Sequence, residues 1–423
     1  MTTTSSDEAS VAGTDFSGDQ RATTVAGATR EYVDKLRGGD MGALPAVLGL
    51  IVLFLVFTIL RPDTFPSFGN LANLTVQAGP ICVLAMGLVF VLLLGEIDLS
   101  AGVAGGVAAC VMAILINDKG WSWPLAVVGG VATGLAIGLV IGLLVARLGI
   151  PSFVVTLAFF LGLQGITLRL IGEGGTVPVR NDVIVGIANS NLPVVWGWIL
   201  AVFVSLAYAA IQLLRLRMQI RRQLQHPPFA LVLARVISLA VVLLAFTYVL
   251  SANRARVPTV TVAGIPYVVP IVGILLVVWT LVLGRTGYGR HIYAVGGNSE
   301  AARRAGIDVR RIRISVFVVC SSMAALSGII AASRLNSVTP DAGAGNTLLY
   351  AVGAAVIGGT SLFGGKGKAR DAVIGGLVIA TIDNGLGLLG LQAYVNYLVT
   401  AGVLLLAASV DAISRRRRSA SGI

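Results

Sequence analysis

Long runs of apolar residues, separated by short polar stretches, make up most of the chain. Several of these runs exceed the ~20 residues that a helix needs to cross a bilayer. The pattern predicts an all-α, polytopic (multi-pass) membrane protein with about twelve transmembrane helices. The predicted spans are 42–60, 71–94, 99–116, 124–146, 151–171, 194–214, 229–250, 267–283, 313–333, 347–363, 371–390 and 393–412. Glycines interrupt the span at 347–363.

Composition agrees with this class. Of the 423 residues, 56% are hydrophobic and 12% are charged, whereas about a quarter of residues are charged in soluble domains. The 52 glycines suit closely packed membrane helices. Cys82, Cys110 and Cys320 are the three cysteines; they lie within apolar runs, without metal-ligand spacing, and are expected to be small packing residues.

The flanking segments predict how the chain is oriented. Residues 1–40 are rich in Ser, Thr and Gly and are expected to be a disordered cytoplasmic tail. The transmembrane domain at 41–412 is followed by a basic tail at 413–423. With both termini in the cytoplasm, the cytoplasmic side holds most of the 31 lysines and arginines, as the positive-inside rule requires. This rule also accounts for the net charge of +12, so no nucleic-acid partner is expected.

The segment at 284–313 is the longest polar stretch between apolar runs. Ser299 is expected to cap a short helix, with the carboxylate of Glu300 in its positive first turn and Gly306 at its end. We expect this cytoplasmic loop to present the helix to a soluble partner. The segment also carries Asp308 and seven arginines, namely Arg285, Arg290, Arg303, Arg304, Arg310, Arg311 and Arg313.

Two glycine-rich elements, at 95–102 and 358–365, share the frame G-x-[IT]-[DS]-L-x-x-G. Glycine breaks at membrane depth are tolerated where the backbone lines a cavity or packs in protein. Paired broken elements in two halves of a transporter point to its pathway. In a glycine-rich chain, a chance match is the alternative.

Polar residues inside the apolar runs are candidates for a translocation pathway, because ionisable groups are costly in lipid. These candidates are Glu96, Asp98, Ser100, Ser361, Asp383 and Asn384. Each has a structural alternative. Glu96 and Asp98 would accept backbone N–H bonds at the start of the next helix, and Asp383 with Asn384 would bond to a neighbouring helix. The outer loops at 172–193 and 251–267 are a landing surface for an external partner or plain connectors.

Three motifs resemble one protein family. Glu300-Ala301-Ala302, followed by Gly306, resembles the coupling loop of binding-protein-dependent ABC importer permeases, and 293–298 resembles the version in their ribose, galactose and xylose branch. The two glycine-rich elements resemble those of the ribose-type permeases, with Glu96 replacing a glycine. The chain departs from the pattern at 316–319, which lack Ile-x-Leu-Pro. Two extra spans between 190 and 265 resemble the xylose branch.

The resemblance implies a type II-like importer permease, with a ten-helix ribose-type core plus two helices. Glu300, Ala301, Ala302 and Gly306 would couple it to a sugar ABC ATP-binding subunit, which holds the ATP and Mg²⁺. An extracytoplasmic sugar-binding protein would deliver a monosaccharide, such as the pentose xylose. A second copy would complete a homodimer in the lipid of the cytoplasmic (inner) membrane.

The chain lacks the G-x-x-x-x-G-K-[ST] loop that cradles nucleotide phosphates. We therefore expect it to be no enzyme and to bind no cofactor or metal, and its two histidines, His226 and His291, form no zinc or nucleophile motif. The alternative is a secondary sugar transporter coupled to protons or sodium through Asp98 or Asp383. Asp383→Asn would distinguish them, because a proton-coupled carrier would lose accumulation, whereas an ABC permease would keep its dependence on ATP.

Overall fold

The computed structural model describes residues 42–255 and 259–392, with isolated positions at 27, 30, 394–395, 397–402, 405–406 and 409. The predicted tail at 413–423 lies outside the described residues, and so does the tail at 1–40 except for two positions. The predicted span at 393–412 is described only in part.

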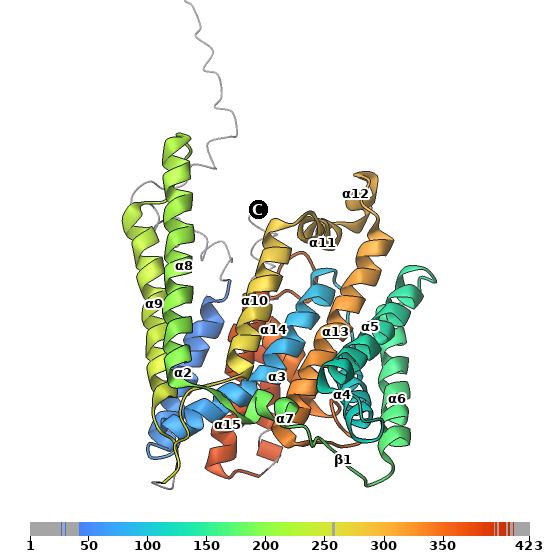
Figure 1. Cartoon of the computed structure of the whole chain (residues 1–423). Helices are drawn as coiled ribbons and strands as arrows, with labels where there is room; N and C mark the ends of the chain where they lie inside the picture. The colour runs from blue at the N-terminus through green and yellow to red at the C-terminus, as the bar shows by residue number, and fades with distance from the viewer. Residues whose placement is uncertain are drawn as a thin grey trace, which may run out of the picture. The chain divides into compact units, whose positions relative to one another are not determined.

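The described chain is almost entirely helical (Figure 1). Its apolar helices are α2 (Leu44–Leu60), α3 (Phe68–Leu93), α4 (Ala101–Asn117), α5 (Trp123–Ala146), α6 (Ser152–Ile171), α8 (Val194–Arg221), α9 (Phe229–Ser251), α10 (Val268–Arg285), α13 (Val309–Leu335), α14 (Asn346–Ile357) and α15 (Ala369–Leu389). Among the described residues, eight helices are long and apolar enough to cross a membrane, and α2, α4 and α14 are shorter. The chain is a multi-pass membrane protein.

The described chain divides into two compact units. The first contains residues 198–246, which form most of α8 and α9. The second contains residues 39–197 and 247–423 and therefore all the other helices. These two helices are the extra spans that the sequence predicts before the polar segment at 284–313.

Helix α13 forms the centre of the second unit and packs against α3, α4 and α5. Phe317 and Cys320 of α13 are fully buried. Glycines of α5 face this helix, and a Cβ added to Gly134 or Gly138 would lie 2.5 Å from a carbonyl oxygen of α13. Small residues therefore allow the two backbones to touch, as expected for helices packed in a membrane.

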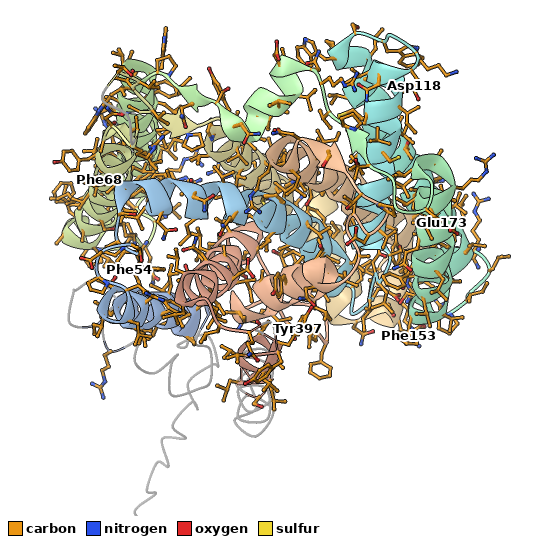
Figure 2. The ribbon with its side chains drawn as sticks, turned by 90° about the horizontal axis from the view of Figure 1, so that it is seen from below. Phe54, Phe68, Asp118, Phe153, Glu173 and Tyr397 are labelled. Atoms are coloured by element: carbon orange, nitrogen blue, oxygen red, sulfur yellow. The ribbon has the colours of Figure 1, made fainter. Side chains whose placement is uncertain are left out.

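Apolar side chains also cover the outside of the second unit. Phe54 of α2 and Phe153 of α6 lie on this outer surface (Figure 2). Only 28%, 22% and 11% of the windows of α5, α6 and α10 that best fit a membrane span are buried. Such exposure suits contact with lipid tails, which solvate apolar side chains.

Short connections at one end of the second unit hold two small antiparallel pairings. Strand β1 (Val177–Pro178) pairs with β4 (Ser337–Val338), and β2 (Asn191–Leu192) pairs with β3 (Ile265–Pro266). The short helix α7 (Asp182–Asn189) lies at the same end, opposite helix α12 (Ser299–Arg304) (Figure 1). The polar segment at 284–313 and the loop at 172–193 therefore lie at opposite ends of this unit.

Two helix predictions need correction. Helix α14 ends at Ile357 rather than at residue 363, because the chain turns at Gly359, Gly364 and Gly365, where φ is positive and favours glycine. The segment at 284–313 contains an additional helix, α11 (Gly287–Gly297), before the predicted short helix. Its four glycines made this helix difficult to predict from propensity.

Candidate functional site

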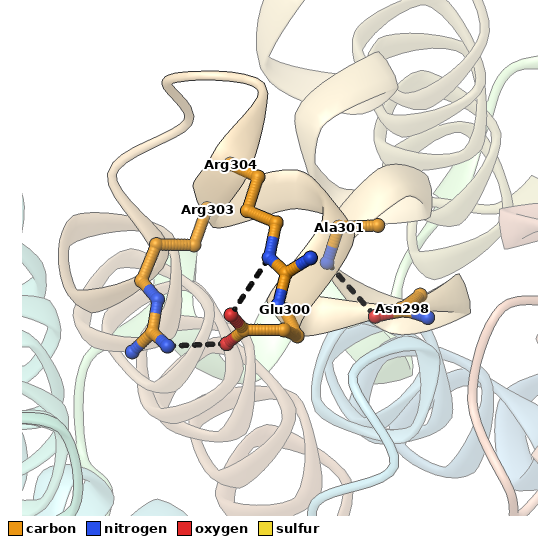
Figure 3. Close-up of polar contacts among 5 residues, drawn as sticks. All are labelled: Asn298, Glu300, Ala301, Arg303 and Arg304. Carbon is orange, nitrogen blue, oxygen red and sulfur yellow. Dashed lines mark hydrogen bonds and ion pairs between the residues drawn. The ribbon is translucent and has the colours of Figure 1, made fainter.

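The short helix α12 lies on the surface, as the sequence predicts, but its cap is different. The side chain of Asn298, rather than Ser299, accepts a 2.9 Å hydrogen bond from the Ala301 N–H (Figure 3). Asn298 has extended backbone geometry (φ −159°), which suits a cap residue, whereas Ser299 is already helical.

Gly306 ends α12 through paired backbone hydrogen bonds. The N–H of Gly306 donates to the Arg303 carbonyl, and the N–H of Ile307 donates to the Ala302 carbonyl, each at 3.0 Å. Together they form a Schellman motif, in which glycine adopts the left-handed conformation; φ is +83° at Gly306. The predicted helix end is confirmed.

The charged side chains of α12 neutralise one another in part. The Glu300 carboxylate bonds to the guanidinium groups of Arg303 and Arg304 (Figure 3). All three side chains are exposed, so these pairs contribute little to stability. Ala302 alone among the four predicted coupling residues is buried, and it packs into the main core. The other three are therefore accessible to a partner.

Helix α11 connects α10 to α12 and anchors the polar segment to the rest of the unit. Ile292 and Val295 bury its apolar face. The Tyr288 hydroxyl donates to Ser315 Oγ of α13 at 2.9 Å, and the Tyr293 hydroxyl donates to the Gly367 carbonyl at 2.6 Å. Burial, and then the nearby Asp371 carboxylate, raises the pKa of Tyr293, so this hydroxyl keeps its proton at neutral pH.

The two glycine-rich elements meet beneath α11. The N–H of Gly365 donates a 2.8 Å hydrogen bond to the carbonyl of Leu93, at the end of α3. Gly296 of α11 lies against the same groups, and a Cβ there would overlap the Leu93 oxygen and lie 3.0 Å from the Gly365 nitrogen. We call Leu93, Gly296 and Gly365 the glycine junction. It places the end of α3 and the second glycine-rich element next to the helix that precedes α12.

The first glycine-rich element contributes three of the predicted pathway residues. Glu96 forms an ion pair with Arg313 of α13, with its Oε1 atom 3.3 Å from Nε. Asp98 is buried, and its Oδ1 accepts from the Ser100 N–H at 2.9 Å and from the Ser100 hydroxyl at 2.7 Å. This is the geometry of the structural alternative, in which Asp98 bonds at the start of α4.

The second glycine-rich element holds Ser361 in a comparable way. Its backbone N–H donates to the Lys366 carbonyl at 2.8 Å, and its hydroxyl accepts from the Phe363 N–H at 3.2 Å. Ser361 is buried. Like Ser100, it stabilises a turn.

Asp383 and Asn384 are neighbours on α15 but have different surroundings. Asn384 is buried and exchanges two 2.9 Å hydrogen bonds with Asn70 of α3. It also donates to Gln77 Oε1 at 3.2 Å. Asp383 is exposed, with its Oδ1 3.5 Å from the Tyr350 hydroxyl. The two residues, which were predicted to act as a pair, therefore lie in different environments.

Sequence reasoning missed several residues of these contacts. Tyr293 and Gly296 belong to the segment at 293–298 that carries the family resemblance, but nothing in the sequence indicates what they touch. Asn70 was also missed. Its spacing of seven residues from Gln77, which places both on one helical face, was the available signal.

The described residues contain no group of three or more His, Cys, Asp or Glu side chains suited to holding a metal. Cys82, Cys110 and Cys320 are free and buried. The chemistry at α12 and the glycine junction consists of capping, packing and hydrogen bonding, which suits mechanical coupling between a membrane bundle and a partner.

A helical membrane bundle with a charged helix at one end defines the chain as a multi-pass membrane protein. A family model described as the permease component of branched-chain amino acid transport systems matches residues 70–408. The chain belongs to this family of transport-system permease components.

Individual relatives cover almost the whole chain. The xylose transport system permease protein of Escherichia coli K12 is 36% identical over 90% of this chain and 94% of its own length. Its counterpart in Haemophilus influenzae is 32% identical over 90% of this chain and 99% of its own length. The ribose import permease protein of E. coli K12 is 33% identical over 86% of this chain and 92% of its own length. The search of solved structures gives no match.

Proposed function

We propose that this chain is the membrane-spanning permease subunit of an ATP-binding-cassette sugar importer. Its cargo is a monosaccharide, and the first choice is a pentose such as xylose, because the xylose and ribose permeases are similar over most of their length. The chain itself holds no nucleotide; ATP and Mg²⁺ bind to a partner ATPase. An extracytoplasmic sugar-binding protein delivers the sugar to the opposite side.

The observation that carries this proposal is the contact of α11 with the end of α3 and with the second glycine-rich element at the glycine junction. Helix α12 presents Glu300, Ala301 and Gly306 to a soluble partner, and Ala302 anchors it. Movement of α12 is passed through α11 to the end of α3 and to the loop between α14 and α15. Packed elements transmit such movements because they repack between discrete arrangements instead of deforming continuously.

The architecture we propose is a type II-like permease with a ten-helix core and the additional helices α8 and α9. Two copies form the dimer, and each docks one ATPase subunit on α12. Both termini lie in the cytoplasm, on the side of α12, and the loop at 172–193 faces outward. The basic residues of the segment at 284–313 support this orientation.

Purification in mild detergent from the native cells tests this proposal. The tagged chain is expected to bring down a soluble ATPase, and proteoliposomes that contain both, with the binding protein outside, are expected to accumulate sugar only when ATP is inside. A chain that purifies alone and accumulates sugar on a proton or sodium gradient would instead be a secondary transporter.

A further inference from the structure

A polar face lies on the exposed surface of the membrane helices, where α13, α14 and α15 meet. Asp383 is exposed and lies 14 residues into α15, six residues before its end at Leu389, which is about 21 Å from one end of the helix and about 9 Å from the other at 1.5 Å per residue. An ionised carboxylate at this position is costly unless it faces polar groups or water. Its exposure therefore needs an explanation other than contact with lipid.

Asp383 does not stand alone on this face. Its Oδ1 lies 3.5 Å from the Tyr350 hydroxyl, and the guanidinium of Arg334 is the positive charge that acts on it. Thr400 and Asn346 are both within hydrogen-bonding reach of the same Tyr350 hydroxyl. Arg334 is exposed, and Tyr350 and Asn346 are half-buried. We call Arg334, Asn346, Tyr350 and Asp383 the polar face.

The backbone is interrupted beside this face. Helix α14 has 12 residues, or about 18 Å, and cannot cross a hydrocarbon core of about 30 Å. It begins after Gly343 and Gly345, both with positive φ, and a Cβ on Gly102 of α4 would overlap the Gly343 carbonyl. Interrupted helices within a membrane occur where backbone is buried in protein or lines a water-filled cavity.

We propose that the polar face receives the hydroxyl groups of the monosaccharide as it crosses the membrane, an inference that rests on the proposed function. Asp383 accepts hydrogen bonds from sugar hydroxyls, and Arg334 and Asn346 donate them. The phenol of Tyr350 does both, and its ring offers an apolar surface to the C–H groups of the sugar.

The charges of the face select for this class of cargo. One guanidinium and one carboxylate cancel, so the face suits an uncharged ligand with many donors and acceptors better than an ion. A branched-chain amino acid would require an apolar pocket for its side chain, whereas these four residues offer hydrogen-bonding groups. Hydrogen bonds to the same groups orient the sugar without retaining it tightly, because water competes for these groups on an exposed surface.

The test uses the complete transporter in proteoliposomes, comparing Asp383→Asn, Arg334→Gln and Tyr350→Phe with the unchanged chain. Xylose uptake and ATP hydrolysis stimulated by the binding protein are measured together. We expect Asp383→Asn and Arg334→Gln to lower uptake at least tenfold and Tyr350→Phe at least threefold. Hydrolysis should stay within twofold, so that more ATP is consumed per sugar moved. Asp118→Asn, which removes an exposed carboxylate at the end of α4, is the control.

Three results are distinguishable. Uptake by Asp383→Asn at the unchanged rate, while uptake remains driven by ATP, would overturn the inference and leave the proposed function standing. Uptake by the unchanged chain without ATP would overturn the proposed function itself. Restored uptake in the charge-exchanged chain, Asp383→Arg with Arg334→Asp, would overturn the sugar-contact role, because it would show that the two charges serve only as an ion pair within or between copies.

Discussion

Gly296 of α11 and the carbonyl oxygen of Leu93 on α3 touch without an intervening side chain. The contact requires glycine, because any Cβ at residue 296 would overlap the backbone oxygen. The same oxygen accepts the hydrogen bond from Gly365. One oxygen atom of α3 therefore contacts α11, the helix that leads to α12, and also accepts a hydrogen bond from the second glycine-rich element.

Replacing Gly296 by alanine should therefore separate α11 from the glycine junction. We expect ATP-driven uptake to fall at least tenfold, because backbone atoms, unlike the end of a flexible side chain, must move to admit the methyl group. Gly297→Ala is the matched control, since a Cβ on Gly297 meets no other atom within 4 Å. Equal uptake by the two variants, at equal amounts in the membrane, would contradict the role of the junction.

Gly306→Glu should abolish recovery of the ATPase and sugar uptake while the chain still inserts into the membrane. A Cβ at residue 306 meets nothing within 4 Å, so the side chain fits within this chain and acts only on a partner and on the backbone. The left-handed conformation costs about 1–2 kcal/mol for most residues but is tolerated by asparagine.

Gly306→Asn is consequently the control for backbone strain and is expected to retain more of the ATPase than Gly306→Glu. Co-purification followed by quantitative blotting measures both. Normal uptake by Gly306→Glu would show that α12 is not the helix on which the ATPase docks.

Tyr293→Phe removes the hydrogen bond to the Gly367 carbonyl and keeps the ring. The loss corresponds to about 0.5–1.5 kcal/mol, or up to about a tenfold decrease in uptake if the bond is needed for coupling. Tyr288→Phe removes a bond of similar length between α11 and α13, away from the second glycine-rich element. The ratio of sugar moved to ATP hydrolysed should fall only for Tyr293→Phe; equal ratios would assign Tyr293 a purely structural role.

Asn384→Leu should destabilise the contact between α3 and α15. It removes the buried partner of the half-buried amides of Asn70 and Gln77, at a cost of about 1–3 kcal/mol, although Asn70 keeps its bond to the Phe65 carbonyl. Thermal inactivation in detergent should therefore begin at a lower temperature, with uptake per folded molecule nearly unchanged. Gln164→Leu, which removes an amide from α6 outside this network, is the comparison. A large loss of uptake in fully folded Asn384→Leu would instead place this residue in the pathway.

The long apolar runs were enough to locate most of the membrane helices, because hydrophobicity over about 20 residues determines insertion. They did not locate the end of α14, because the position of this helix end depends on the backbone conformation of Gly358 and Gly359. Helix α11 was also missed, since its four glycines weaken the local helix signal and burial of Ile292 and Val295 stabilises it. Tertiary packing overrides propensity in both places.

The candidate site was likewise predictable from the sequence only in part. Local capping and end signals placed Glu300 in the first turn of one short surface helix and Gly306 at its end. The roles of Asp98 and Asn384 depend on residues far away or on the direction of a side chain, which spacing alone does not give. The partnership of Asn384 with Asn70, 314 residues earlier in the chain, could be found only in three dimensions.

The pairing of β2 with β3 has an evolutionary consequence. Leu192 and Ile265 are directly opposite each other, so the segments of the second unit that precede α8 and follow α9 are held side by side. A gene segment that encodes residues 193–264 can therefore be gained or lost without rerouting the remaining helices. Permeases with and without this hairpin can share one ancestral membrane core, and the hairpin is free to diverge at its own rate.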